Sequence, residues 1–203
     1  MYIPDLYKNE NQTEIEKLIH ENGFAVLVNQ TNGKLWATHI PLLLEHKNDK
    51  QFLVGHVSKL NPQAESFKTN DDVLAIFSGS HSYISSSWYD HENVPTWNYL
   101  AVHVYGKLKL HSYEESIEAL KRLVDKYEAK SENPVRVENL SEKTMREARG
   151  IVSFEIEITA IESVKKLSQN RDDKNYKNII SELEKTNDNQ AIEVAKEMKK
   201  NRP

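Results

Sequence analysis

The sequence contains no cysteine, which excludes disulfides, thiolate metal ligands and a cysteine nucleophile. Hydrophobic residues make up only 38% of the 203 positions, and no apolar run approaches the roughly 20 residues that a membrane-spanning helix needs. The N-terminal stretch "MYIPDLYKNENQ" lacks the basic start and apolar block of a secretory signal. These absences predict a protein of the reducing cytoplasm that has no membrane partner.

Several motifs of catalytic and nucleotide-binding folds are also missing. Neither GxGxxG nor GxxxxGK[ST] occurs, and no serine lies in a GxSxG turn. The segment "HENVP" begins like a zinc-protease helix, but Pro95 stands where that motif needs its second histidine. We therefore predict no metal site. The net charge of −4 argues against nonspecific binding of nucleic acid by the whole surface.

The sequence does contain a series of short apolar segments that are typical of β-strands. The dipeptide Asn32-Gly33 between the first two segments is a strong hairpin signal. Such strands at hairpin-like spacing predict an antiparallel barrel with peripheral helices, a mainly β protein of the α+β class. The expected strands are 24–30, 35–44, 51–57, 72–79, 101–110 and 150–161.

Helices are expected between and after these strands. Two of them begin at predicted capping boxes, Thr13 with Glu16 and Ser112 with Glu115. The composition turns polar after residue 162. We therefore expect a barrel domain over 1–162 and a helical extension over 163–203, which packs on the barrel or on a dimer partner. Three further helices are expected at 141–150, 173–185 and 189–200.

One polar segment suits a phosphate group. In "HVSKLNPQ" a strand ends and then presents Ser58, Lys59 and Asn61 within four residues. Lysine supplies a point charge, and the hydroxyl and amide groups supply further donors. The alternative reading of this segment is an ordinary polar turn.

Three other segments add groups that suit a flat heterocycle. Thr38 and His39 lie inside an apolar strand, where polar groups need partners. An aromatic ring can cover the face of a heterocycle, and amide side chains match its donor and acceptor edge. Trp97 and Asn98 in "VPTWNY" supply such a ring and an amide, and "KLSQNR" supplies the Ser168 hydroxyl and the Gln169 amide.

Six segments together resemble one known family. In order they are "ATHIPL", "GHVSKLNPQ", "SYISSSWY", "VPTWNYLAVHVYG", "GIVSFEIEI" and "KLSQNR". Their order and spacing resemble the PaiB-type FMN-binding negative transcriptional regulators of bacilli, over almost the whole chain. The resemblance implies an FMN-binding split β-barrel related to the pyridoxamine-phosphate-oxidase and flavin-reductase barrels. It also implies a homodimer with FMN in clefts at the subunit interface.

The resemblance assigns roles to the polar segments. Ser58, Lys59 and Asn61 would take the FMN phosphate and ribityl chain, and Thr38 and His39 would lie along the isoalloxazine. Trp97, Asn98, Ser168 and Gln169 would close the site, in one arrangement from the partner subunit. This sequence offers a single cation at the phosphate, Lys59, where related barrels often use more. Arg171 and Lys166 are the candidates for a second cation, and the shortage predicts weak FMN binding.

Three functions are compatible with the sequence. The first is a flavin-binding regulator without turnover, which represses protease synthesis and sporulation through DNA or a regulatory protein partner. The second is an FMN-dependent oxidoreductase, in which the flavin carries the chemistry. The third is a haem-binding or haem-degrading split barrel with a histidine as axial ligand.

Overall fold

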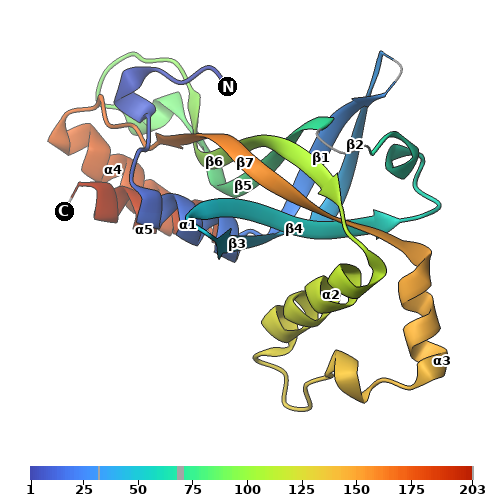
Figure 1. Cartoon of the computed structure of the whole chain (residues 1–203). Coiled ribbons are helices and arrows are strands. Elements are labelled where there is room, and N and C mark those ends of the chain that lie inside the picture. Colours follow the sequence, from blue (N-terminus) through green and yellow to red (C-terminus); the bar gives the residue numbers. More distant parts are fainter. Residues whose placement is uncertain (32, 68–70, 203) are drawn as a thin grey trace. The chain divides into compact units, whose positions relative to one another are not determined.

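The computed structural model describes residues 1–31, 33–67 and 71–202 (Figure 1). Its strands form a seven-stranded sheet in the order β2-β1-β5-β6-β7-β4-β3, and the pairs whose registers are defined are antiparallel. Strand β2 also contacts β4, which curls the sheet toward a barrel and confirms the predicted fold class. The strands are β1 (Phe24–Thr31), β2 (Lys34–Pro41), β3 (Leu43–Lys47), β4 (Lys50–Ser58), β5 (Asp71–Ile84), β6 (Thr96–Leu110) and β7 (Ile151–Lys166).

The helices confirm the predicted C-terminal pair and the capping box at Ser112. The α-helices are α1 (Gln12–Glu21), α2 (Tyr113–Glu128), α3 (Glu142–Met145), α4 (Asp173–Glu184) and α5 (Asn189–Asn201). Short 3₁₀ helices are η1 (Asp5–Tyr7), η2 (Pro62–Ser66), η3 (Ser86–Trp88), η4 (Val137–Asn139) and η5 (Arg146–Gly150).

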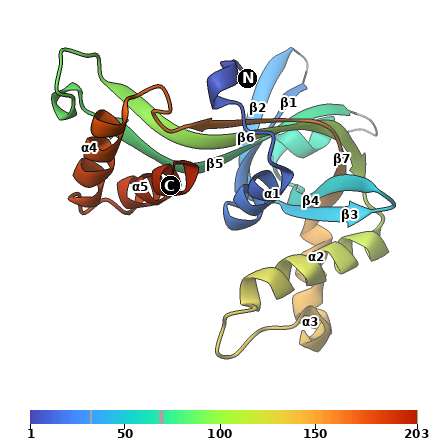
Figure 2. The same cartoon turned by 90° about the vertical axis from the view of Figure 1, so that its left-hand side faces the viewer.

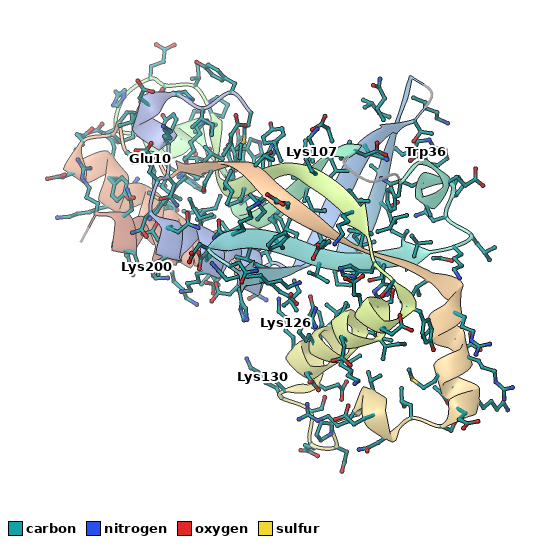
Figure 3. All side chains as sticks on the ribbon, in the orientation of Figure 1. Glu10, Trp36, Lys107, Lys126, Lys130 and Lys200 are labelled. Carbon is teal, nitrogen blue, oxygen red and sulfur yellow. The ribbon has the colours of Figure 1, made fainter. Side chains whose placement is uncertain are left out.

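The first hairpin forms where the sequence predicts it. The register of β1 and β2 runs from Phe24 opposite Pro41 to Thr31 opposite Lys34. Gly33 has φ of +77°, a left-handed conformation that glycine adopts without steric cost, whereas Asn32 lies outside the described residues. Near the turn the Lys34 ammonium lies 4.8 Å from the centroid of the Trp36 ring, which Figure 3 labels.

Several predicted element boundaries are wrong. Strand β5 continues to Ile84, β6 begins at Thr96 and β7 continues to Lys166, each five residues beyond the predicted limit. The strand expected over 35–44 is interrupted, because Pro41 has no N–H and ends the ladder of β2. Leu42 is fully buried at the break, and its N–H donates to the Gly23 carbonyl over 2.8 Å. Helix α1 begins one residue before Thr13, and the Asn11 side chain accepts from the Glu14 N–H over 3.2 Å. Asparagine is a strong N-cap residue, so it takes the position that we assigned to Thr13.

The chain divides into two compact units, each made of separate stretches of sequence. Unit 1 contains 1–18, 78–103 and 162–203, and unit 2 contains 19–77 and 104–161. Strand β7 runs through residue 162, the boundary that the composition suggested.

In unit 1 the C-terminal helices share a core with earlier residues. Helices α4 and α5 lie side by side (Figure 2). Ile84, Tyr89 and Leu167 are buried with them in one apolar cluster. The segment 163–203 therefore packs against residues of its own chain.

The core of unit 2 is built from the inward-facing residues of its strands. Leu27, Leu53, Phe77 and Phe154 are fully buried. The Phe67 ring meets the Phe154 ring edge-on at 5.3 Å between centroids. Burial on alternate positions of β1 and β5 agrees with the period-2 pattern from which the strands were predicted.

The capping box of α2 gives a first testable expectation. The Ser112 Oγ accepts from the Glu115 N–H, and the Glu115 carboxylate accepts from the Ser112 N–H over 2.7 Å. Replacing Ser112 by alanine should lower the free energy of unfolding by about 1 kcal/mol, the usual cost of losing such a cap. Urea denaturation measures the change. Ser131→Ala, an exposed serine after the same helix, is the matched control, and an equal loss in both variants would contradict the role of the cap.

Candidate functional site

The turn after β4 leaves the predicted phosphate ligands exposed. Ser58, Lys59 and Leu60 are all exposed. The Leu60 N–H donates to the Ser58 Oγ over 3.1 Å, and the Lys59 N–H donates to the Gly150 carbonyl over 2.8 Å. These bonds fix the backbone of the turn, so the Lys59 side chain starts from a defined position.

A network of hydrogen-bonded polar side chains holds this turn in place. The Asn61 amide donates to the Thr38 Oγ1 over 2.9 Å, and its oxygen accepts from the Gln63 N–H over 2.9 Å. The Thr38 hydroxyl donates to the Gln63 Oε1. Gln63 is fully buried, and its Nε2 donates to the Asn29 Oδ1 at 3.0 Å and to the Leu27 carbonyl at 3.2 Å. The structure thus brings Thr38 and Asn61 together, and each bonds to the other.

Lys59 lines a cavity of about 510 Å³ in unit 2. This volume lies within the range of small-molecule sites, roughly 300–1,000 Å³. Arg149 and His111 line the same cavity, so a second cation and an imidazole accompany Lys59. The other lining residues are Leu110, Tyr113, Ser116, Ala148, Ile151, Val152 and Ser153.

Arg149 is a candidate residue that the sequence reasoning missed. It stands in η5, directly before β7, and no recognisable spacing connects it with Lys59 in the sequence. The feature of the sequence that could have pointed to Arg149 was its positive charge directly before a predicted strand. The alternatives that we named, Lys166 and Arg171, belong to unit 1, whereas Lys59 belongs to unit 2.

His111 is held on the cavity wall by Ser153. The Ser153 Oγ donates to the Gly55 carbonyl over 3.3 Å and lies 3.0 Å from the His111 Nδ1. The Ser153 hydroxyl proton is already donated to the Gly55 carbonyl. The His111 Nδ1 is therefore the donor in the bond between His111 and Ser153. The Nε2 of His111 lies 3.7 Å from the Glu155 carboxylate. Burial lowers the pKa of His111, while Glu155 and Glu115 oppose that shift.

Three partly buried histidines give an expectation for pH. Burial lowers the pKa values of His56, His103 and His111 below the usual value of about 6.5. The unfolded chain therefore binds more protons than the native state as the pH falls through that value. We expect the free energy of unfolding to be retained above about pH 6.5 and to decline below it.

Urea denaturation over this range of pH tests the expectation. His56→Gln should flatten the profile, because it removes one group whose pKa differs between the two states. The histidine at position 20 is exposed, and His20→Gln is the matched control variant. A stability that rises on acidification would contradict the assignment.

His39 lies on the exposed face of strand β2. Its ring stacks on the Phe24 ring with centroids 6.1 Å apart and planes 29° apart, and Phe24 is 67% exposed. Thr38 points the other way, into the network below the turn. The two neighbouring residues therefore face different surroundings, and His39 is the one that is open to a ligand.

Trp97 belongs to an aromatic surface in unit 1. Its ring is 53% exposed and meets the Tyr83 ring edge-on, with centroids 6.0 Å apart. The His81 ring is tilted against it at 6.2 Å. His81, Trp97 and Tyr99 line a shallow hollow of about 380 Å³. A planar ring has room to lie against this surface.

Asn98, Ser168 and Gln169 lie together but use their polar groups within the protein. Asn98 is fully buried and accepts from the Ser168 hydroxyl over 3.0 Å. Ser168 has φ of +59°, and the neighbouring Gln169 side chain donates to the Lys165 carbonyl and accepts from the Leu167 N–H over 2.7 Å. These bonds shape the turn after β7, and a role in cofactor binding stays a prediction.

The ranges that the structure describes are 1–31, 33–67 and 71–202. No group of three or more His, Asp or Glu side chains in these ranges is arranged to hold a metal ion. Within the same ranges, no helix has the length and apolar character to cross a membrane.

The fold and its cavity define the class of protein. The backbone is similar to an FAD and haem binding protein from Mycobacterium smegmatis, with a TM-score of 0.60 and 13% identity over 79% of this chain and 73% of that one. It is equally similar to the flavocytochrome Anf3 from Azotobacter vinelandii, with a TM-score of 0.60 and 16% identity over 84% and 75%. The chain has the fold of the flavin-binding split barrels.

The sequence then identifies the family. A family model described as "Putative FMN-binding domain" matches residues 1–160, and the chain belongs to that family. A relative from Bacillus subtilis, "Protease synthase and sporulation protein PAI 2", is 43% identical over 199 residues, which is 98% of this chain and 96% of the relative. The resemblance to the PaiB-type family is confirmed. A flavin is the cofactor that this family and fold indicate.

Proposed function

We propose that this chain is an FMN-binding negative regulator of protease synthesis and sporulation genes, acting in the cytoplasm as a homodimer. The observation that carries the proposal is the 43% identity to the Bacillus subtilis relative over nearly the full length of both chains. The relative's name connects that protein with protease synthesis and sporulation.

The cavity at Lys59 supports FMN as the flavin. A terminal phosphate distinguishes FMN from riboflavin, and it needs cations and hydrogen-bond donors. Lys59 and Arg149 supply two cations, and Ser116 and Tyr113 add hydroxyl groups. In this proposal these residues hold the phosphate, while His39 lies along the ring system. Bound flavin would supply redox chemistry, and the residues at the cavity orient it.

A titration of flavin-free protein with FMN and with riboflavin tests the cofactor assignment. We expect FMN to bind more tightly, because only FMN carries the group that Lys59 and Arg149 recognise. Equal affinity for the two flavins would contradict the phosphate site. A parallel titration with haem tests whether the chain is instead a haem-binding or haem-degrading split barrel.

Exposed apolar residues of unit 2 support the homodimer. Phe24 is 67% exposed on β1 and Leu35 is 70% exposed on β2, and both side chains lie on the same face of the hairpin. Exposed apolar groups of this size often mark interfaces. Light scattering should give twice the chain mass of 23.5 kDa, and a strict monomer would rule the homodimer out.

The regulatory role needs its own experiment. Deleting the gene should raise the expression of a protease reporter, and a variant that does not bind FMN shows whether the flavin is needed for repression. A gel-shift assay at a stated salt concentration separates direct DNA binding from action through a regulatory protein partner. Unchanged reporter expression in the deletion strain would contradict the proposal.

A further inference from the structure

His111 lies on the wall of the cavity that Lys59 and Arg149 also line, here called the Lys59 cavity. The His111 side chain is only 3% exposed, whereas the two cations are exposed. All three residues belong to unit 2. A charge that enters the Lys59 cavity therefore lies near an imidazole that water hardly reaches, where electrostatic effects are stronger than at the surface.

Hydrogen bonds define which nitrogen of His111 can take up a proton. The Nδ1–H of His111 donates to the Ser153 Oγ over 3.0 Å, because the Ser153 hydroxyl donates to the Gly55 carbonyl over 3.3 Å. In the neutral ring the Nε2 then carries no proton. This nitrogen lies 3.7 Å from the Glu155 carboxylate, so a proton on Nε2 would face a negative charge.

The charged groups around His111 come from several elements and offset one another. Glu155 of β7 lies 3.3 Å from the ammonium groups of Lys47 in β3 and Lys109 in β6, and Glu115 of α2 is engaged in the capping box. Burial lowers the pKa of His111, Glu155 and Glu115 oppose that shift, and Lys47 adds to it. The imidazole is therefore neutral at about pH 7 in the ligand-free protein.

Lys59 and Arg149 give the Lys59 cavity a positive charge that is not offset. Neither cation has an acidic partner within the described ranges 1–31, 33–67 and 71–202. A phosphate group that binds to them brings negative charge to the wall that His111 forms. An opposite charge within about 4–6 Å favours the protonated form of an imidazole.

We propose that His111 takes up a proton on Nε2 when a phosphate group binds in the Lys59 cavity, and that the imidazolium is the third cation of the site. This role of His111 rests on the proposed function, in which the phosphate belongs to FMN. The proton and the phosphate then stabilise each other, because coupling between two bound ligands is reciprocal. FMN should bind more tightly as the pH falls, whereas riboflavin, which has no phosphate, should not.

Calorimetry with FMN counts the proton. The full-length, flavin-free protein is titrated at about pH 7 in two phosphate-free buffers of different ionisation enthalpy, and the difference in heat gives the protons taken up per FMN. The wild-type protein should take up more than His111→Gln, by up to about one proton. The second ionisation of the phosphate, at about pH 6, contributes to both titrations and cancels in the comparison. His20→Gln removes an exposed histidine of unit 2 that does not line the cavity, and it should match the wild type.

The FMN affinity provides a readout that a structural role of His111 would not change. As the pH falls from about 8 to about 7, the Kd of the wild-type protein for FMN should decrease about twofold to tenfold, the range for coupling to one proton or a fraction of one. In His111→Gln the Kd should not depend on pH over the same interval. A variant that was only less stable would bind both flavins more weakly and keep the dependence on pH.

NMR of the wild-type protein with ¹³C-labelled histidine gives a test that needs no variant at position 111. The titration of His111 should move to higher pH when FMN is added and should not move with riboflavin. Equal proton uptake by the wild type and His111→Gln, or an unmoved titration, overturns this role while FMN binding itself stands. An absence of FMN binding, or FMN binding that survives the loss of both Lys59 and Arg149, overturns the phosphate site and this role with it.

Discussion

Replacing both Lys59 and Arg149 by alanine is expected to weaken FMN binding about 100-fold or more. A hydrogen bond to a charged group contributes roughly 1.5–3 kcal/mol, and about 1.4 kcal/mol corresponds to a tenfold change in Kd. Both cations line the same cavity, so their loss would remove the positive charge that is proposed to hold the FMN phosphate. Each single replacement should raise Kd by about tenfold or more.

Fluorescence titration measures these affinities, and riboflavin provides the internal comparison. Because riboflavin has no phosphate, the double variant should bind it as the wild-type protein does. Lys130→Ala is the matched protein control, since Lys130 is an exposed lysine just after α2 (Figure 3). A double variant with unchanged FMN affinity would refute the placement of the phosphate in this cavity.

Gln63→Leu is expected to destabilise the protein by about 3 kcal/mol or more, against a typical total stability of about 5–15 kcal/mol. The Gln63 side chain bonds to Thr38, Asn29 and the Leu27 carbonyl, and it is fully buried. Leucine has a similar volume but leaves those partners unsatisfied, and each unpaired buried group costs about 1–3 kcal/mol.

Urea denaturation tests this expectation. Gln30→Leu, at an exposed position on β1 of the same unit, should change the midpoint little. A similar small change in Gln63→Leu would show that the network contributes little to stability. The FMN affinity of Gln63→Leu at low temperature adds information, because the network also supports the turn that carries Lys59.

The strands were predictable because a pattern of period 2 is a local property of the sequence. The exact ends were harder to predict. Pro41 carried a clear signal that the strand should end there, but the apolar run through Leu44 outweighed it in the prediction. At α1, Thr13 formed a convincing capping box with Glu16, yet Asn11 was available two residues earlier and caps the helix.

The candidate site was only partly predictable, because a site depends on contacts between distant segments. Lys59 could be chosen from its local context, whereas Arg149 joins it only through the packing of η5 beside the end of β4. Asn98 and Ser168 show the opposite effect. Their polarity suggested a ligand, but folding brings them together across 70 positions, and they bond to each other.

The interleaving of the two units has a consequence for synthesis on the ribosome. Unit 1 joins residues near the start of the chain to β7, since Lys8 bridges to Val164 and Asn9 donates to the Ser163 carbonyl over 3.0 Å. The last of these partners is translated more than 150 residues after the first. Unit 1 therefore completes its fold only after β7 has been translated, and such distant pairing is intrinsically slow. Until then Ile84 and Tyr89 lack the residues of α4 and α5 with which they are buried, and exposed apolar surface of this kind is prone to aggregate and to bind chaperones.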